Sequence, residues 1–304
     1  MTRCLSHLQL AQIGKFWGAG FLTLGLQTSR YDSSATLLDS GRACRTEATY
    51  IRFRSPSIPQ VKGKLVPLDE NEERDRLAAI AADSRYASGV NSASIKYSAH
   101  VFSRHWRAGN LLELGPAEGV MTELLAPHFE RMTLVDGSDQ FCKSLQVRFP
   151  KATVIHSLFE EFSTTDLFDT IILGHVLEHV DDTAAVLAVA RCHLRPGGVI
   201  CAAVPNSRSL HRQAAVLMGL LPFESALNDT DRHHGHRRVY NPESLMRDFR
   251  EAHLKVKVFG GYWMKPLSNG QLEAQWTAPM IDAFMQLGER YPDIAAEIYV
   301  IAEA

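Results

Sequence analysis

Strand-like and helix-like segments alternate between residues 110 and 204, and this alternation leaves few folds open to the chain. The strand-like runs are Asn110–Leu114, Met132–Val135, Thr153–His156, Thr170–Leu173 and Val199–Val204. The helix-like runs between them are Gly119–His128, Gln140–Arg148 and Thr183–His193, and the last is followed by a turn at Arg195–Gly198. Strands that alternate with helices form parallel sheets covered by helices, so the pattern predicts an α/β fold.

Further elements flank this region. Helices are predicted at Glu70–Asp83 and Ile95–Trp106, and two more strands at Lys255–Gly261 and Ala295–Ala302, with a helix near Pro279–Arg290 between them. The last strand can insert antiparallel. The prediction is therefore a mostly parallel seven-stranded sheet.

The chain length sets the domain organisation. At roughly 150 residues per domain, 304 residues form one large domain with attachments or two modest ones. We expect a poorly ordered or loosely packed extension over 1–60, a helical lead-in over 61–108, and a main domain over 109–304 with insertions near 206–241 and 263–293. The apolar run Phe16–Leu26 lacks a clean cleavage site, which favours part of the extension over a targeting signal.

Net charge indicates which partners the protein does not favour, and the cysteine content indicates its compartment. A net charge of −2 disfavours nucleic acid and anionic membranes as the main partners. Five cysteines without a C-x-x-C pair fit a reducing compartment, so we expect a cytoplasmic protein, monomeric or homodimeric.

A glycine-punctuated turn follows the first strand of the alternating region, in the segment Leu112–Gly119. A dinucleotide-binding fingerprint from Gly115 would need glycine at positions 117 and 120, where Ala117 and Val120 stand. What remains is a carboxylate two residues before the first glycine and a second glycine four residues after it. Such a turn lets the backbone approach a ligand closely.

Asp136 ends the second strand, where an ionised carboxylate can accept hydrogen bonds from both hydroxyls of a ribose. The alternative is that Asp136 only caps the helix that begins near Asp139. The spacing from the glycine turn favours the ribose.

Four ordered motifs resemble class I S-adenosylmethionine-dependent methyltransferases of the small-molecule, bacterial biosynthetic type. They are E-x-G-x-x-x-G from Glu113, Asp136, the Phe168–Val180 segment with its Leu-Glu-His, and Leu194–Gly198 before a strand. The resemblance covers roughly residues 90–304. It implies a Rossmann-like fold with helices on both faces, the last strand antiparallel, and S-adenosyl-L-methionine as cofactor. It also implies that the lead-in over 61–108 covers the cofactor, that 109–304 form the catalytic domain, and that the insertions near 206–241 and 263–293 shape the acceptor pocket.

The resemblance also implies the cofactor-binding residues. They are Tyr97, Glu113, Gly115, Pro116, Ala117, Gly119, Asp136, Gly137, Ser157, Leu158, Phe159, Gly174 and His175. The chain departs from the family at Ala117, where a further glycine is usual, and at Ser157, which replaces the usual aspartate. Backbone contacts of Leu158 and Phe159 with adenine are therefore preferred.

A histidine-rich segment at 231–240 is predicted to line the acceptor pocket, although a metal site or a solvated loop is the alternative. The expected acceptor-binding residues are His211, His234, Arg237, Arg238, Tyr240 and Tyr262. His175 is the expected general base, because it emerges at the carboxyl end of the fourth strand, and the rival bases are His233, His234 and His236.

The sequence thus predicts methyl transfer to a small-molecule acceptor, with a hydroxyl oxygen preferred over nitrogen or carbon. A non-catalytic cofactor-binding module is the alternative. A nucleic-acid methyltransferase is less favoured, because Gly174–Leu177 stands where an Asn/Asp-Pro-Pro-aromatic motif would follow the fourth strand.

Overall fold

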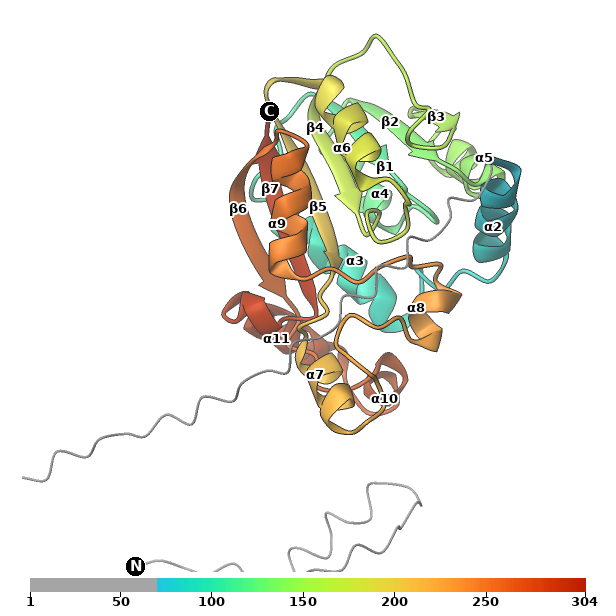
Figure 1. The fold of residues 1–304 in the computed structure, drawn as a ribbon. Coiled ribbons are helices and arrows are strands. Elements are labelled where there is room, and N and C mark those ends of the chain that lie inside the picture. The colour runs from blue at the N-terminus through green and yellow to red at the C-terminus, as the bar shows by residue number, and fades with distance from the viewer. Residues whose placement is uncertain (1–69) are drawn as a thin grey trace, which may run out of the picture. The chain divides into compact units, whose positions relative to one another are not determined.

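A seven-stranded sheet forms the centre of the computed structural model, which describes residues 70–304 (Figure 1). The strands are β1 (Asn110–Leu114), β2 (Arg131–Asp136), β3 (Thr153–His156), β4 (Phe168–Gly174), β5 (Leu194–Pro205), β6 (Lys255–Tyr262) and β7 (Glu297–Glu303). They lie in the order β3-β2-β1-β4-β5-β7-β6. The first five pair in parallel, whereas β7 is antiparallel to both β5 and β6. The predicted sheet with an antiparallel last strand is confirmed.

Helices cover both faces of this sheet. They are α2 (Glu70–Ala82), α3 (Gly89–Phe102), α4 (Val120–Leu125), α5 (Asp139–Arg148), α6 (Thr183–Cys192), α7 (Leu210–Leu217), α8 (Asp229–His233), α9 (Pro242–Glu251), α10 (Asn269–Glu273), α11 (Ala278–Glu289) and the 3-10 turn η2 (Pro292–Ile294). In Figure 1, α6 and α9 lie in front of the sheet, and α3 and α4 lie behind it.

Alternating side chains of the strands build a separate hydrophobic core on each face. In β4, Ile171 and Leu173 pack into the core under α6 and α9, whereas Ile172 packs into the other, which includes residues of α3, α4 and α11. Because both faces are covered, these strands are apolar at nearly every position rather than at every second one.

Most predicted boundaries agree with the structure to within a few residues, and two elements illustrate the larger differences. The predicted turn Arg195–Gly198 lies inside β5, because Leu194 pairs with Phe168 and the register then shifts before Val199 pairs with Thr170. The helix predicted at Ile95–Trp106 is α3, which begins at Gly89 and ends at Phe102.

The extension predicted over 1–60, with its apolar run Phe16–Leu26, lies outside the described residues. Within residues 70–304, none of the helices combines the length and the apolar character that crossing a membrane requires.

The parallel strands end at one common edge. Leu114 of β1 is paired with Val135 of β2, and Asp136 with His156 of β3. Open parallel sheets bind ligands beyond the carboxyl ends of their strands, so this edge positions the candidate site.

Candidate active site

The turn after β1 is built from residues with left-handed backbone conformations. Gly115, Ala117 and Gly119 have φ angles of 71°, 46° and 76°. A Cβ atom at Gly115 would lie 2.8 Å from a methyl group of Val176, so glycine is required there for space as well as conformation. Ala117 takes this conformation without being glycine, at the position where the family usually has one, and is strained.

Asp136 connects this turn to β2. Its Oδ2 accepts a hydrogen bond from the Ala117 N–H at 3.1 Å, and its Oδ1 accepts one from the Ser138 N–H at 2.8 Å. Burial raises the pKa of Asp136 to about 6, although the two N–H groups oppose that rise. Ser138, rather than Asp136, caps α5, because its hydroxyl accepts from the Phe141 N–H.

Glu113 lies deeper, in β1, and is 2% exposed. Its Oε2 accepts a hydrogen bond from the Thr122 hydroxyl at 2.8 Å. Burial raises its pKa to about 7, and the nearby carboxylate of Asp136 adds to the rise. Glu113 is therefore close to its titration midpoint at neutral pH.

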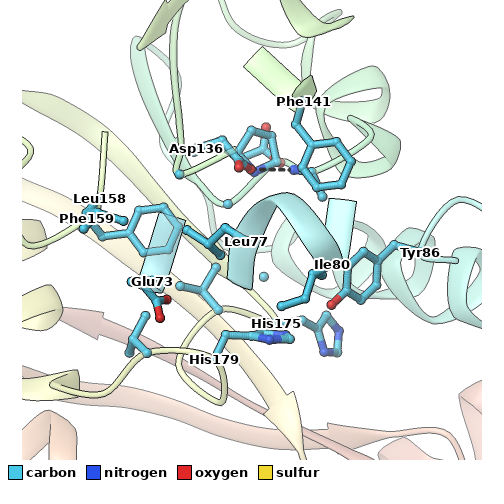
Figure 2. Close-up of a pocket in the computed structure, with 18 of the residues that line it drawn as sticks. Glu73, Leu77, Ile80, Tyr86, Asp136, Phe141, Leu158, Phe159, His175 and His179 are labelled. Atoms are coloured by element: carbon cyan, nitrogen blue, oxygen red, sulfur yellow. Dashed lines mark hydrogen bonds between the residues drawn. The ribbon is translucent and has the colours of Figure 1, made fainter. Parts of the chain in front are cut away.

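A cavity of about 380 Å³ opens at this edge of the sheet (Figure 2). Its lining includes most of the residues expected to bind a cofactor: Glu113, Gly115, Pro116, Ala117, Asp136, Gly137, Leu158, Phe159, Gly174 and His175. Tyr97, Gly119 and Ser157 are not in that lining. Gly119 shapes the turn, the Tyr97 hydroxyl donates to Glu289, and the Ser157 hydroxyl donates to the backbone carbonyl of Leu158.

Helix α2 supplies lining residues that sequence reasoning missed. Glu73, Leu77 and Ile80 face the cavity, and Figure 2 shows α2 crossing it. A Cβ atom at Gly137 would lie 2.5 Å from Leu77, so α2 packs directly against the end of β2. The helix and a cofactor-covering role for residues 61–108 were predicted, but no local signal indicated which of its side chains face the cavity.

A second cavity of about 310 Å³ adjoins the first. The two linings share Tyr86, Ile95, His175 and His179. Three of the histidines expected at an acceptor pocket, His211, His234 and His236, also line the second cavity. We call the first the cofactor cavity and the second the acceptor cavity, after the residues that the sequence analysis expects to bind each ligand.

His175 lies at the boundary of the two cavities. Its Nε2 is 3.1 Å from the hydroxyls of both Ser98 and Tyr262. Its Nδ1 is 3.6 Å from Oε1 of Glu178 and 3.7 Å from Oε2 of Glu297. Burial lowers the pKa of His175, but the two carboxylates raise it more, so that the pKa lies above its ordinary value.

The other expected acceptor residues lie outside the acceptor cavity. Arg237 forms ion pairs with Glu73 and Asp181, and Arg238 donates to the backbone carbonyls of Val180 and Asp181. The remaining two are buried, with the Tyr240 hydroxyl donating to Asp248 and the Tyr262 hydroxyl next to Ser98 at 2.6 Å. His233, a rival base, lies 3.6 Å from Asp83 and lines a different hollow between α2 and α8.

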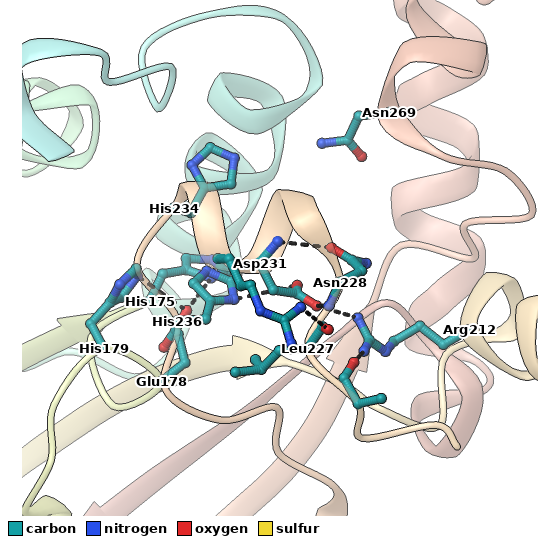
Figure 3. Close-up of polar contacts among 12 residues, drawn as sticks. His175, Glu178, His179, Arg212, Leu227, Asn228, Asp231, His234, His236 and Asn269 are labelled. Carbon is teal, nitrogen blue, oxygen red and sulfur yellow. Dashed lines mark hydrogen bonds and ion pairs between the residues drawn. The ribbon is translucent and has the colours of Figure 1, made fainter. Parts of the chain in front are cut away.

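Among the described residues, one group has the composition of a metal site. Ligand atoms of Glu178, His179 and His236 all lie within 4.8 Å of one another. The rings of His179 and His236 meet edge to face, with centroids 4.7 Å apart (Figure 3). Burial and the neighbouring His236 lower the pKa of His179 to about 3, so His179 is neutral at physiological pH.

Most of the residues that form the sheet and the two cavities match a known protein family. A family model described as a methyltransferase domain matches residues 73–257. The chain belongs to this methyltransferase family. The predicted class I methyltransferase fold and the S-adenosylmethionine cofactor are thereby confirmed.

Individual relatives differ in how much of them the chain covers. Nodulation protein S of Bradyrhizobium diazoefficiens is 37% identical over 87 residues, which are 28% of this chain and 42% of the relative. A ubiquinone biosynthesis O-methyltransferase of Methylocella silvestris is 28% identical over 205 residues, 60% of this chain and 77% of the relative. The chain therefore spans about two fifths of the length of the nodulation proteins that it matches.

Solved structures share the fold. The N-methyltransferase NodS from Bradyrhizobium japonicum, in complex with S-adenosyl-L-homocysteine, has a TM-score of 0.51 at 17% identity, over 76% of this chain and 97% of that chain. An S-adenosylmethionine-dependent methyltransferase from Mesorhizobium loti has a TM-score of 0.52 at 13% identity, over 71% of this chain and 100% of that chain. At these identities the likeness concerns the fold alone.

Proposed function

We propose that the protein transfers the methyl group of S-adenosylmethionine to a hydroxyl oxygen of a small-molecule acceptor. The observation that carries this proposal is the pair of adjoining cavities with His175 at their boundary. One cavity has the family's cofactor motifs and the other has a wall of histidines. A methyl group presented from the first cavity meets an acceptor in the second.

The residues of the cofactor cavity fit S-adenosylmethionine. Its volume of about 380 Å³ is within the range of cofactor sites. Asp136 is assigned to the ribose hydroxyls, because its carboxylate keeps acceptor capacity beyond its two backbone hydrogen bonds. Glu113 and the turn from Gly115 to Ala117 lie where the amino-acid end would bind, and Leu158 and Phe159 where adenine would bind.

When bound, the cofactor supplies a methyl group on a positively charged sulfur. The acceptor oxygen forms a bond to that methyl carbon as the carbon–sulfur bond breaks, and the bond pair neutralises the sulfur. The hydroxyl proton must go to a base. The chain's task is to align the acceptor, exclude water and take this proton.

His175 is the proposed base, through Nδ1. Glu178 and Glu297 line the acceptor cavity and face Nδ1, whereas Ser98 and Tyr262, which face Nε2, do not. When Nε2–H donates to one of these hydroxyls, the Nδ1 lone pair is the one available on the cavity side. The rival bases in the same cavity are His234 and His236, and Nδ1 of His236 lies 3.5 Å from Oδ1 of Asp231.

The test is methyl transfer to metabolites from an extract, followed by mass spectrometry of molecules that gain a labelled methyl group. His175→Gln should lower kcat by roughly 10²–10⁴-fold and leave cofactor affinity unchanged. Loss of cofactor binding with kcat preserved at saturation would instead make His175 a binding residue. Tight S-adenosylhomocysteine binding without transfer to any metabolite would favour a non-catalytic module.

A further inference from the structure

Two carboxylates in the acceptor cavity lack the hydrogen-bond donors that buried carboxylates need. Glu178 is 1% exposed and Glu297 is 9% exposed. Both oxygens of Glu178, and Oε2 of Glu297, are buried and accept no hydrogen bond from any residue within 70–304. Burying a charge without such partners is costly, so these oxygens form a site for a donor from outside the described chain.

A third carboxylate in the same cavity, that of Asp231, does have hydrogen-bond donors within the described chain (Figure 3). Asp231 accepts hydrogen bonds from Nη1 of Arg212 at 3.0 Å and from the Asn228 N–H at 2.9 Å. Arg212 is thereby committed to Asp231. The ammonium of Lys265 lies 4.8 Å from the ring centroid of Trp263, and burial lowers its pKa to about 8. Neither cation forms a hydrogen bond or ion pair with Glu178 or Glu297 in the described part of the chain.

His175 cannot serve both unpaired carboxylates. Its Nδ1 lies almost equally far from Glu178 and Glu297, at 3.6 and 3.7 Å, and offers one N–H even when protonated. Nε2 of His179 is 4.0 Å from Glu178. The cluster therefore has more buried acceptors than donors, and an ammonium group, with three N–H donors and a positive charge, matches that deficit.

We propose that the acceptor carries a protonated amino group, which binds to Glu178 and Glu297 and anchors the acceptor in its cavity. This inference rests on the proposed function. An ammonium nitrogen has no free electron pair, so the anchored group is not the one that is methylated. Glu178 and Glu297 line the acceptor cavity but not the cofactor cavity, so the anchor lies beyond His175 and directs the other end of the molecule towards the methyl group.

The first experiment identifies the charge of the methylated molecule. The full chain is incubated with methyl-labelled S-adenosylmethionine and a metabolite extract, and the labelled products are separated on a cation-exchange resin at pH 7. The inference expects a retained product that carries its label on oxygen. A labelled product in the flow-through, or one labelled on nitrogen, overturns it while leaving methyl transfer itself established.

The second experiment removes one carboxylate charge. Glu297→Gln should raise KM for the retained acceptor on the order of 10–100-fold, because a charge-assisted interaction is lost, while S-adenosylhomocysteine affinity stays within twofold. Glu303→Gln is the matched control, since Glu303 is on the same strand and pairs with Lys257 instead. An unchanged KM in Glu297→Gln would overturn the anchor.

A third measurement needs no turnover. Ethylammonium chloride and, separately, ethanol are titrated into the S-adenosylhomocysteine-bound protein while the imidazole signals of His175 are followed by NMR. A saturable shift with ethylammonium alone, lost in Glu297→Gln, supports the anchor, and its absence counts against it. If no product is labelled, the proposed function fails and the inference about the acceptor fails with it, and the titration then shows only whether Glu178 and Glu297 bind an ammonium group.

Metal analysis of the purified protein tests whether a divalent metal, rather than an ammonium group, binds at Glu178. A divalent metal bound stoichiometrically and lost in Glu178→Gln would assign the carboxylate to a metal, together with His179 and His236, and overturn the amine anchor. Protein without such a metal that still responds to ethylammonium supports the anchor.

Discussion

Replacing Asp136 by alanine is expected to weaken S-adenosylhomocysteine binding by about 1.5–3 kcal/mol, the usual range for a hydrogen bond to a charged group, or roughly 10–150-fold. The effect on stability should be smaller. Burial already raises the pKa of Asp136 to about 6, which means that its two backbone hydrogen bonds do not fully offset the cost of burying the charge. Asp136→Asn keeps one accepting oxygen and should fall between the wild type and alanine.

The assay is isothermal titration calorimetry at pH 8 and pH 5, with a thermal melt of each variant. Below pH 6 the wild-type carboxyl takes up a proton, so its affinity should approach that of Asp136→Asn, whereas Asp136→Asn should show little of this pH dependence. Asp139→Ala is the control, because the Asp139 side chain is 58% exposed and forms a surface ion pair with Lys143. Affinity of Asp136→Ala within twofold of the wild type at pH 8 would refute the ribose assignment.

Three further predictions follow from strained or buried groups. Ala117→Gly should raise the melting temperature by about 1–4 °C in calorimetry, because relief of an alanine at φ 46° exceeds the extra freedom of glycine in the unfolded chain; a lower melting temperature would contradict the strain. The acidic limb of the pH–rate profile should lie above pH 6.5, because the carboxylates of Glu178 and Glu297 raise the pKa of His175 more than burial lowers it. Glu178→Gln should move this limb to lower pH. A limb at the same pH in the variant would exclude His175 as the titrating base. Burial lowers the pKa of His179 to about 3, so His179 stays neutral in the folded protein, whereas in the unfolded chain it takes up a proton below about pH 6.5. Urea titrations should therefore show the free energy of unfolding falling as the pH drops from 7 to 5, with a slope approaching about 1.4 kcal/mol per pH unit. His179→Phe should flatten that slope, and an equal slope in the variant would assign the pH dependence to other groups.

Local patterns were sufficient to predict the framework of the site. The glycine turn directly follows β1, Asp136 is the last residue of β2, and parallel strands bring their ends to one edge. The position of each of these residues at the end of its own strand was therefore enough to predict that they lie together. His175 reached the same edge for the same reason.

Contacts between distant segments could not be read from the sequence. The sequence predicts Arg237 as an acceptor-binding residue, but in the folded chain its charge is paired with Glu73 of α2 and with Asp181. Glu297 lies at the start of an ordinary apolar strand, and only the antiparallel insertion of β7 beside β5 brings it to His175. A sequence pattern gives a residue's own element, but not the charge that another element places opposite it.

The backbone conformation at His175 positions two residues that line the acceptor cavity, His175 and Glu178. His175 has a φ of 62°, and its N–H donates to the carbonyl of Ala203 in β5, so the chain turns sharply where β4 ends. That turn places Glu178 three residues later beside the His175 ring. Glycine would take this conformation without strain, yet histidine stands there. At Ala117 the strained position carries only a methyl group, whereas at His175 the side chain faces both cavities. Strain at a non-glycine residue persists when the surrounding structure enforces it and often marks a functional site. We therefore attribute the strain at His175 to the ring that the position presents, which agrees with the role of base that the proposed methyl transfer to a hydroxyl gives it.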